Sequence, residues 1–252
     1  MKLYYATGTC SLSPHIVAIE AGIALELERV DIRKIPRVTE TGEDYAQVNP
    51  NLYVPALALD DGTILLEGTA IVQYLADLAP ASGLAPPPGS LARVQLQSWL
   101  GFIATELHKV FSPWLFHPEY GTQAQDVARS RLAARLDYVE RQLASGGPYL
   151  LGERYSIADA YLYTILSWSA HTKVDLSAFP QVRRLIERVG ERPAVQQACA
   201  KRRADIDKTY FYHHNIELDE YAAMRHHSPV SSTSSQELDS ARSRSGLFFA
   251  HF

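Results

Sequence analysis

The chain has 252 residues, of which 46% are hydrophobic and 21% are charged, so it can bury one large core or two smaller ones. Its 24 Lys and Arg against 28 Asp and Glu give a net charge of −4, which argues against a nucleic-acid partner or an anionic membrane surface. No stretch approaches the roughly 18 apolar residues of a membrane span, and the first residues lack the apolar run of a signal peptide. We therefore expect a soluble, cytoplasmic protein that binds neither nucleic acid nor membrane.

The first 79 residues alternate short strand-like and helix-like segments. Helical spacing of apolar residues stops at Gly22, a residue type favoured just after a helix, and Asp60-Asp61-Gly62 is a strong hairpin signal. The predicted strands cover residues 2–5, 26–32, 56–59 and 63–66, and the predicted helices cover residues 14–21 and 68–78. A βαβ unit followed by ββα is typical of an α/β domain.

A Pro- and Gly-rich stretch from Ala79 to Gly89 has neither the helical nor the strand spacing of apolar residues, and it is typical of a linker. After it, apolar residues recur at helical spacing over residues 91–111, 125–143, 157–168 and 179–189. Ser156 and Asp159 form a capping-box pattern at the start of the third of these helices. The sequence therefore predicts an α/β domain over residues 1–79, a linker over 80–90, and an all-helical domain over 91–203.

Residues 204–252 differ in composition from both domains. Eight Ser and one Thr fall between residues 228 and 245, and such a segment cannot bury enough apolar surface to offset the entropy of ordering it. Of the histidines at 213, 214, 226, 227 and 251, the first four form two adjacent pairs, but no third ligand recurs at a metal-coordinating spacing. We expect a largely disordered extension and no metal site.

Cys10 is the first candidate for chemistry, because it ends a glycine-containing turn between a predicted strand and a predicted helix. A thiol there faces unpaired N–H groups and the positive end of the helix dipole, which favour the thiolate and lower the thiol pKa. The pattern Cys10-x-x-Ser13 has no second cysteine, so an external thiol would have to resolve any disulfide. The alternative is a buried structural cysteine, the commonest fate of a lone cysteine.

Two other turns carry candidate binding groups. Pro55 opens the strand before the hairpin. In thioredoxin-like domains a proline at this place exposes backbone N–H and C=O groups that bind an extended peptide, and the alternative is a proline that only begins the strand. The N–H groups of Gly68 and Thr69 could bind a carboxylate and Glu67 an ammonium, as an α-amino acid terminus requires. Helix capping by Thr69 explains this second motif equally well.

A small, polar stripe separate from the apolar face runs along the first helix of the second domain. Its members are Gly101, Thr105, His108 and Ser112, with Lys109 at the edge. A helix that lines a cleft has such a stripe. A histidine on a polar face is more often simply solvated, so the stripe alone does not establish a site.

Together and in this order, these features resemble the glutathione transferases, most closely the bacterial beta class. The most specific stretches are residues 1–5 with 10–15, 67–77, 106–113 and 156–161, and the resemblance covers residues 1–203. It implies a thioredoxin-like N-terminal domain that binds glutathione and a helical domain that binds a small hydrophobic electrophile. It also implies a homodimer active in detoxification, with glutathione as co-substrate and no other cofactor.

The resemblance assigns roles to single residues. Cys10 matches the active-site cysteine, which can form a mixed disulfide with glutathione, and His108 completes the expected catalytic pair. Val54, before a cis Pro55, would pair its backbone with the cysteinyl unit. The remaining expected glutathione contacts are Glu67 and Gly68 at the γ-glutamyl end, and Thr105, His108 and Lys109 near the sulfur and the cleft wall.

Two departures from the family pattern concern glutathione contacts. Gly101 stands where beta-class relatives usually have Asn, which removes one polar contact. The loop over residues 33–37 is two residues longer than the family's, so the ligand of the glycyl carboxylate is either Lys34 or Arg37.

Three functional hypotheses follow. The first is conjugation of reduced glutathione to small electrophiles, with the thiolate stabilised by Cys10, His108 and the helix N-terminus. The second is glutathione-dependent thiol–disulfide exchange through a Cys10 mixed disulfide. The third is a non-catalytic ligand-binding protein, because one fold serves many functions. A Cys10→Ala variant separates the first two, since disulfide exchange through Cys10 must disappear.

Overall fold

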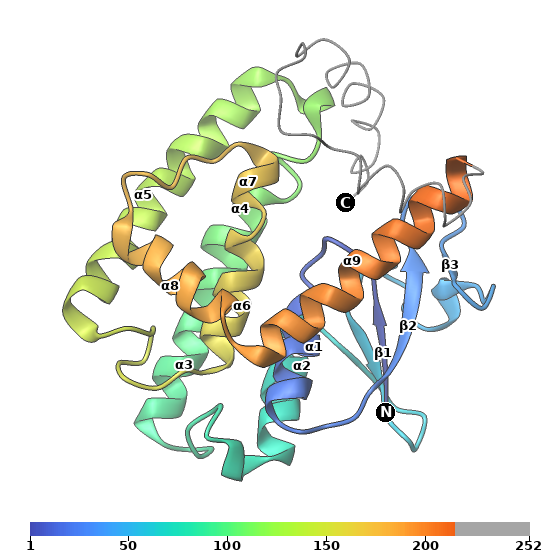
Figure 1. Ribbon diagram of the computed structural model, residues 1–252, viewed down its shortest axis with the longest axis horizontal. Coiled ribbons are helices and arrows are strands. Elements are labelled where there is room, and N and C mark those ends of the chain that lie inside the picture. The colour runs from blue at the N-terminus through green and yellow to red at the C-terminus, as the bar shows by residue number, and fades with distance from the viewer. Residues whose placement is uncertain (215–252) are drawn as a thin grey trace, which may run out of the picture.

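Five strands form one mixed sheet in the N-terminal part of the computed structural model, which describes residues 1–214 and side chains as far as residue 205 (Figure 1). Their bounds are β1 (Lys2–Tyr5), β2 (Glu26–Asp31), β3 (Val38–Thr39), β4 (Ala56–Ala58) and β5 (Ile64–Leu66). The spatial order is β3-β2-β1-β4-β5, with β1 parallel to β2 and antiparallel to β4. The sequence did not predict β3, because two residues are too few to show alternation.

Two helices complete this domain. They are α1 (Leu12–Glu20) and α2 (Gly68–Leu78), which pack against each other. Gly22 follows α1 with a left-handed φ of 69°, and Gly62 turns the β4–β5 hairpin with a φ of 87°, as predicted for both. The strand order and the two helices confirm the predicted thioredoxin-like domain.

The second domain is helical, as predicted. Its helices are α3 (Leu91–Phe102), α4 (Lys109–Phe111), α5 (Thr122–Gly146), α6 (Ile157–Leu166), α7 (Ser169–Thr172), α8 (Pro180–Gly190) and α9 (Pro193–His214). The predicted continuous helix over 91–111 is wrong in one respect, because Ile103–His108 between α3 and α4 is π-helical. A π-helix hydrogen-bonds over five residues, so the side chains that follow it leave the face expected from α-helical spacing.

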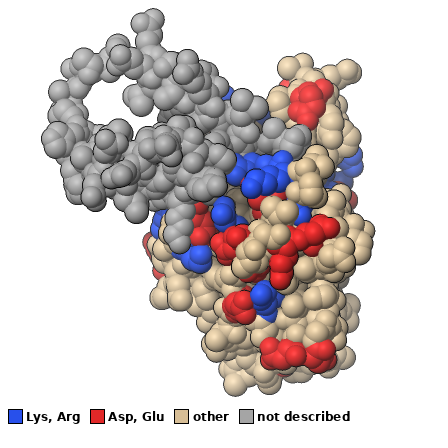
Figure 2. Space-filling view, turned by 90° about the vertical axis from the view of Figure 1, so that its right-hand side faces the viewer, with Lys and Arg blue, Asp and Glu red and all other residues tan. Residues whose placement is uncertain are grey.

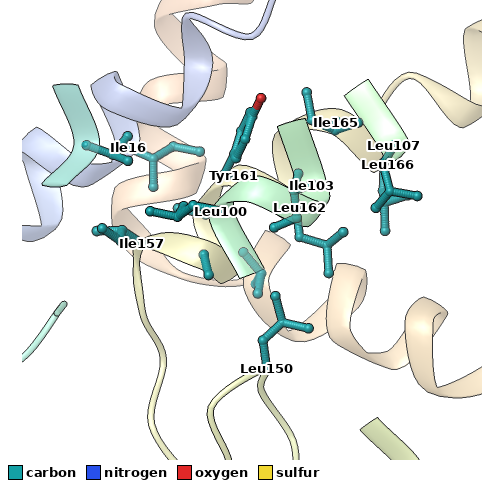
Figure 3. Packing of buried hydrophobic residues seen from close by; sticks show 14 of the residues in the cluster. Ile16, Leu100, Ile103, Leu107, Leu150, Ile157, Tyr161, Leu162, Ile165 and Leu166 are labelled. Carbon is teal, nitrogen blue, oxygen red and sulfur yellow. The ribbon is translucent and has the colours of Figure 1, made fainter. Parts of the chain in front are cut away.

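Helix α6 lies at the centre of the molecule, and nine of its ten residues are buried. Its apolar side chains meet Ile16 of α1, Leu100 of α3 and Ile103 of the π-helical segment in one cluster (Figure 3). Fully burying one such side chain stabilises the fold by about 1.5–3 kcal/mol, so this cluster is a major source of stability. The predicted capping box of Ser156 and Asp159 begins α6.

Helix α9 leaves the helical domain and runs across the N-terminal domain, where it packs on α1 (Figure 1). The predicted boundary after residue 203 falls inside this helix, and Asp205 is buried against Tyr5 of β1. Residues 204–214 therefore continue α9 instead of starting an extension. The rest of the predicted extension, residues 215–252, lies outside the described residues.

Charged side chains of both signs lie intermixed on the face shown in Figure 2, in keeping with the small net charge of −4. Within residues 1–214, no helix has the length and apolar character needed to span a membrane.

Candidate active site

Cys10 lies in the turn between β1 and α1, immediately before the first turn of the helix. Its Sγ–H donates a hydrogen bond to the carbonyl oxygen of Val54 across 3.4 Å. Val54 precedes β4 and is 8% exposed. The Cys10 turn and the Val54 segment therefore form two sides of one site, as the resemblance implied.

The electrostatics of Cys10 differ from the sequence prediction of a lowered pKa. Burial raises the pKa of the Cys10 thiol to about 12, against the opposing influences of a backbone hydrogen bond and the Lys109 charge. Desolvation of the charged form outweighs the helix terminus here. The protonated thiol is thus the favoured form of Cys10, and in this form it donates the hydrogen bond to Val54.

The Val54–Pro55 peptide is cis, as the resemblance implied. A Cβ added to Gly68 would lie 3.6 Å from Pro55 Cγ, so the start of α2 packs directly on this proline. Gly68 and Thr69 are the first two residues of α2, and N–H groups at those positions have no partner within the helix. The Cys10, Val54 and Gly68 backbones thus converge.

Glu67 stands just before α2 with a φ of 67°, in the left-handed region that non-glycine residues rarely adopt. Such strain costs on the order of 1–3 kcal/mol and clusters at functional sites. The Glu67 side chain is exposed and does not cap α2. Its carboxylate is therefore available to a ligand lying on the N–H groups of Gly68 and Thr69.

The two candidates for the glycyl carboxylate lie in different places. Lys34 is exposed and its Nζ lies 3.8 Å from Asp31 Oδ2 at the end of β2. Arg37 instead donates through Nη1 to the carbonyl of Leu52, two residues before Val54. Of these two contacts, the one made by Arg37 reaches the segment that carries Val54.

His108 faces the interior side of the helical wall. Its Nδ1 lies 2.7 Å from the Tyr161 hydroxyl, and its ring meets the Trp168 ring edge-on with centroids 5.1 Å apart. Burial and the adjacent Lys109 charge lower the pKa of His108 to about 4. This pKa favours the neutral form of His108 at pH 7.

The polar stripe predicted on one helix face is divided by the π-helical segment. Gly101 and Thr105 are exposed, and the Thr105 hydroxyl donates to the Gly101 carbonyl across 3.0 Å. Lys109 is also exposed, and its Nζ lies 5.7 Å from the Tyr53 ring, one residue before Val54. Lys109 thus bridges the helical wall and the N-terminal wall.

Two residues that the sequence analysis did not select complete the helical wall. Tyr161 is 5% exposed, and Figure 3 shows its hydroxyl pointing away from the packed leucines and isoleucines. Trp168 donates from Nε1 to the Gly8 carbonyl across 3.0 Å, so it contacts the Cys10 turn directly. Neither has a local sequence signal, because each is an aromatic residue in an apolar helical pattern.

A hollow of about 950 Å³ lies away from this site, between the linker, α3 and α5. Its aromatic lining is Trp99, Phe102, Tyr138 and Tyr155, and it contains none of the predicted site residues. No group of three or more His, Cys, Asp or Glu that could hold a metal ion occurs within residues 1–214.

Comparisons with known proteins identify both domains. Residues 8–78 match the family model described as glutathione S-transferase, N-terminal domain, and residues 102–193 match the C-terminal domain model. Glutathione S-transferase GstA of Escherichia coli O157:H7 is 44% identical over 200 residues, covering 79% of this chain and 98% of GstA. The glutathione complex of a sphingomonad glutathione S-transferase is 42% identical, with a TM-score of 0.76 over 80% of this chain and 98% of that one. A beta-class enzyme from Sphingomonas chungbukensis is 39% identical, with the same TM-score and coverage.

Proposed function

This chain belongs to the glutathione S-transferase family, and we propose that it conjugates reduced glutathione to small hydrophobic electrophiles. The observation that carries the proposal is the convergence of Cys10, Val54 and Gly68 on one backbone-lined site. Support also comes from the sphingomonad relative, whose structure is a complex with glutathione.

The polar groups of the site suit the three parts of glutathione. The N–H groups at the start of α2 and the Glu67 carboxylate suit the carboxylate and ammonium of the γ-glutamyl end. The Val54 backbone suits the cysteinyl unit, and we assign the glycyl carboxylate to Arg37 because its guanidinium contacts Leu52. Thr105 and Lys109 line the opposite, helical wall.

The protonated state of Cys10 favours conjugation over disulfide exchange. Glutathione bound to the Val54 carbonyl competes with the Cys10 Sγ–H, which is then available to donate to the glutathione sulfur. The glutathione thiol releases its proton to solvent, and the thiolate forms the C–S bond as the leaving group departs from the electrophile. Exchange through Cys10 needs the Cys10 thiolate, which burial disfavours.

Titration calorimetry with reduced glutathione tests the binding site. Glu67→Gln removes the carboxylate that pairs with the ammonium, and a hydrogen bond to a charged group is worth about 1.5–3 kcal/mol. We therefore expect affinity to fall by about 10- to 100-fold. Glu153→Gln, on an exposed loop outside the site, is the matched control and should bind like the parent. Absence of saturable binding to the folded parent refutes the proposal.

Turnover of an activated aryl chloride, 1-chloro-2,4-dinitrobenzene, tests the reaction. Cys10→Ala should retain measurable conjugation and lose reduction of glutathione mixed disulfides. A parent that reduces mixed disulfides without conjugating the aryl chloride would favour the Cys10-dependent exchange chemistry. Binding without turnover of either kind in the parent would favour the ligand-binding alternative.

We also infer a homodimer in the cytoplasm. Leu91 and Val94 lie one turn apart on α3 and are 75% and 53% exposed, an apolar edge that continues toward Gly101 and Thr105 of the site. Val94→Asp should reduce the mass measured by light scattering to that of a monomer. Val127→Asp on α5, where valine is 55% exposed, is the control and should leave the mass unchanged. Cys10 and Cys199 are both free thiols, which suits a reducing compartment.

A further inference from the structure

Arg202 of α9 lies buried beneath the turn that carries Cys10. Its side chain is 6% exposed, and its guanidinium donates to the carbonyl of Ala6 across 3.2 Å and to the carbonyl of Ser11 across 3.1 Å. These two carbonyls stand on either side of Cys10 in the sequence. One planar fork therefore joins the entry and the exit of the turn, a geometry that lysine cannot reproduce.

The position of Arg202 is itself tightly defined. Its guanidinium carbon lies 3.8 Å from the centroid of the Tyr5 ring, within the range of a cation–π contact. The Tyr5 hydroxyl donates to Asp205 Oδ2 across 2.7 Å, and Lys201 Nζ lies 2.8 Å from Asp205 Oδ1. Residues 201–205 of α9 thus bind Tyr5, the last residue of β1, and place the Arg202 guanidinium against the segment that carries Cys10.

A second residue of the helical domain holds the middle of the same turn. Trp168 Nε1 donates to the Gly8 carbonyl across 3.0 Å. Within the turn, the Thr9 and Ser11 hydroxyls also donate to the Ala6 carbonyl, across 2.9 and 3.1 Å. The carbonyls of Ala6, Gly8 and Ser11 therefore all accept hydrogen bonds from side chains.

This arrangement has a direct consequence for the sulfur. A glycine-containing turn loses about 1–2 kcal/mol of backbone entropy per residue when it is ordered, so it needs such contacts to hold one conformation. The Cys10 Sγ–H meets the Val54 carbonyl at 3.4 Å only while that conformation is held. The positive charge of Arg202 also lowers the pKa of Cys10, although burial outweighs it.

We propose that Arg202 is a positioning residue for Cys10: its guanidinium binds the Ala6 and Ser11 carbonyls and so fixes the sulfur opposite Val54. This inference rests on the proposed function for its effect on turnover, but the placement of the sulfur can be measured without glutathione. The C-terminal helix is thereby part of the site's construction, although no α9 side chain is assigned a contact with glutathione.

The test compares Arg202→Lys with Arg203→Lys in a Cys199→Ser background, where Cys10 is the one remaining cysteine. Arg203 is exposed on the same helix and serves as the matched control. The first readout is the rate of Cys10 alkylation by iodoacetamide as a function of pH. We expect Arg202→Lys to raise this rate about tenfold, because a loosened turn opens the sulfur to reagent, and Arg203→Lys to leave it within twofold.

The second readout is conjugation at saturating glutathione. We expect kcat to fall about tenfold in Arg202→Lys with KM for glutathione within threefold, because the contacts assigned to glutathione are intact. An unchanged alkylation profile in folded Arg202→Lys overturns the inference, whether or not its melting temperature falls. If the parent binds no glutathione, the proposed function fails, while the alkylation comparison still decides the role of Arg202.

Discussion

Replacing Asp159 by alanine removes one carboxylate that serves three donors in the centre of the molecule. Its Oδ1 accepts from the Leu150 backbone N–H across 2.9 Å, and its Oδ2 accepts from the Ser156 N–H and the Ser156 hydroxyl, both across 2.8 Å. Asp159 is 0% exposed, so water cannot replace the lost acceptor. The variant therefore leaves two buried backbone N–H groups unpaired at the start of α6.

The size of the loss follows from these contacts. Each buried amide left without an acceptor costs about 1–3 kcal/mol, and the lost helix cap adds about 1 kcal/mol. We expect the free energy of unfolding to fall by about 3–7 kcal/mol, a large part of the 5–15 kcal/mol typical of a folded protein. Ser156→Ala loses only the hydroxyl, so it should cost about 1 kcal/mol.

Urea denaturation followed by tryptophan fluorescence measures both variants. Burial raises the pKa of Asp159 to about 6, so pH 7.5 keeps the parent carboxylate ionised. Protein concentration must be held constant, because the proposed dimerisation would shift the apparent stability. A loss for Asp159→Ala within 1 kcal/mol of that for Ser156→Ala would refute the reasoning that buried amide pairing dominates here.

Three further predictions concern pH, the C-terminus and glutathione affinity. Burial lowers the pKa of His15 to about 4, so its neutral form favours the fold above pH 6.5 and that contribution is lost as pH falls toward 4. Between pH 6.5 and 4.5 the free energy of unfolding should fall by about 2–3 kcal/mol from this residue, and His15→Gln should flatten this part of the curve of stability against pH. Parallel curves for the parent and the variant would contradict this prediction. A chain ending at His214 should keep the parent melting temperature and activity. A chain ending at Arg203 lacks Asp205, the hydrogen-bond partner of Tyr5, so its melting temperature should fall by at least about 4 °C. Equal melting temperatures of the two chains would show that the end of α9 contributes little. A Cβ at Gly101 meets nothing within 4 Å, so an Asn side chain fits there. We expect Gly101→Asn to tighten glutathione binding about 2- to 10-fold in a calorimetric titration. Unchanged affinity would show that the site does not use this position.

Local patterns in the sequence were enough to predict most of the fold. Gly22 and Asp60-Asp61-Gly62 end their elements through backbone geometry that few residues can adopt, and Ser156 with Asp159 begins α6 through a local hydrogen-bond pattern. The length of α9 could not be predicted in this way. Its residues beyond 203 mix polar and apolar types, and Asp205 there accepts a hydrogen bond from Tyr5, which is 200 residues away in the chain.

The structure places Cys10 next to Val54 and Gly68 next to Pro55, whereas the electrostatics of Cys10 differ from the sequence prediction. Cys10, Val54, Glu67 and Gly68 carry turn and strand signals, so their proximity followed from the topology. The helix-terminus argument for a low Cys10 pKa failed, because burial depends on side chains from the other domain that no local pattern reveals. The lowered pKa of His108 likewise could not be read from the sequence, because its burial involves aromatic residues from other helices, such as Trp168.

The path of α9 also determines when the Cys10 turn of a newly made chain can be completed. Domains fold in order of synthesis at about 5–20 residues per second, so the first domain waits on the order of 10 s before Asp205 can reach Tyr5. Throughout that interval the Ala6 and Ser11 carbonyls lack the Arg202 guanidinium. A chain that stops before α9 therefore has the strands and helices of the first domain but lacks one of the groups that hold the Cys10 turn.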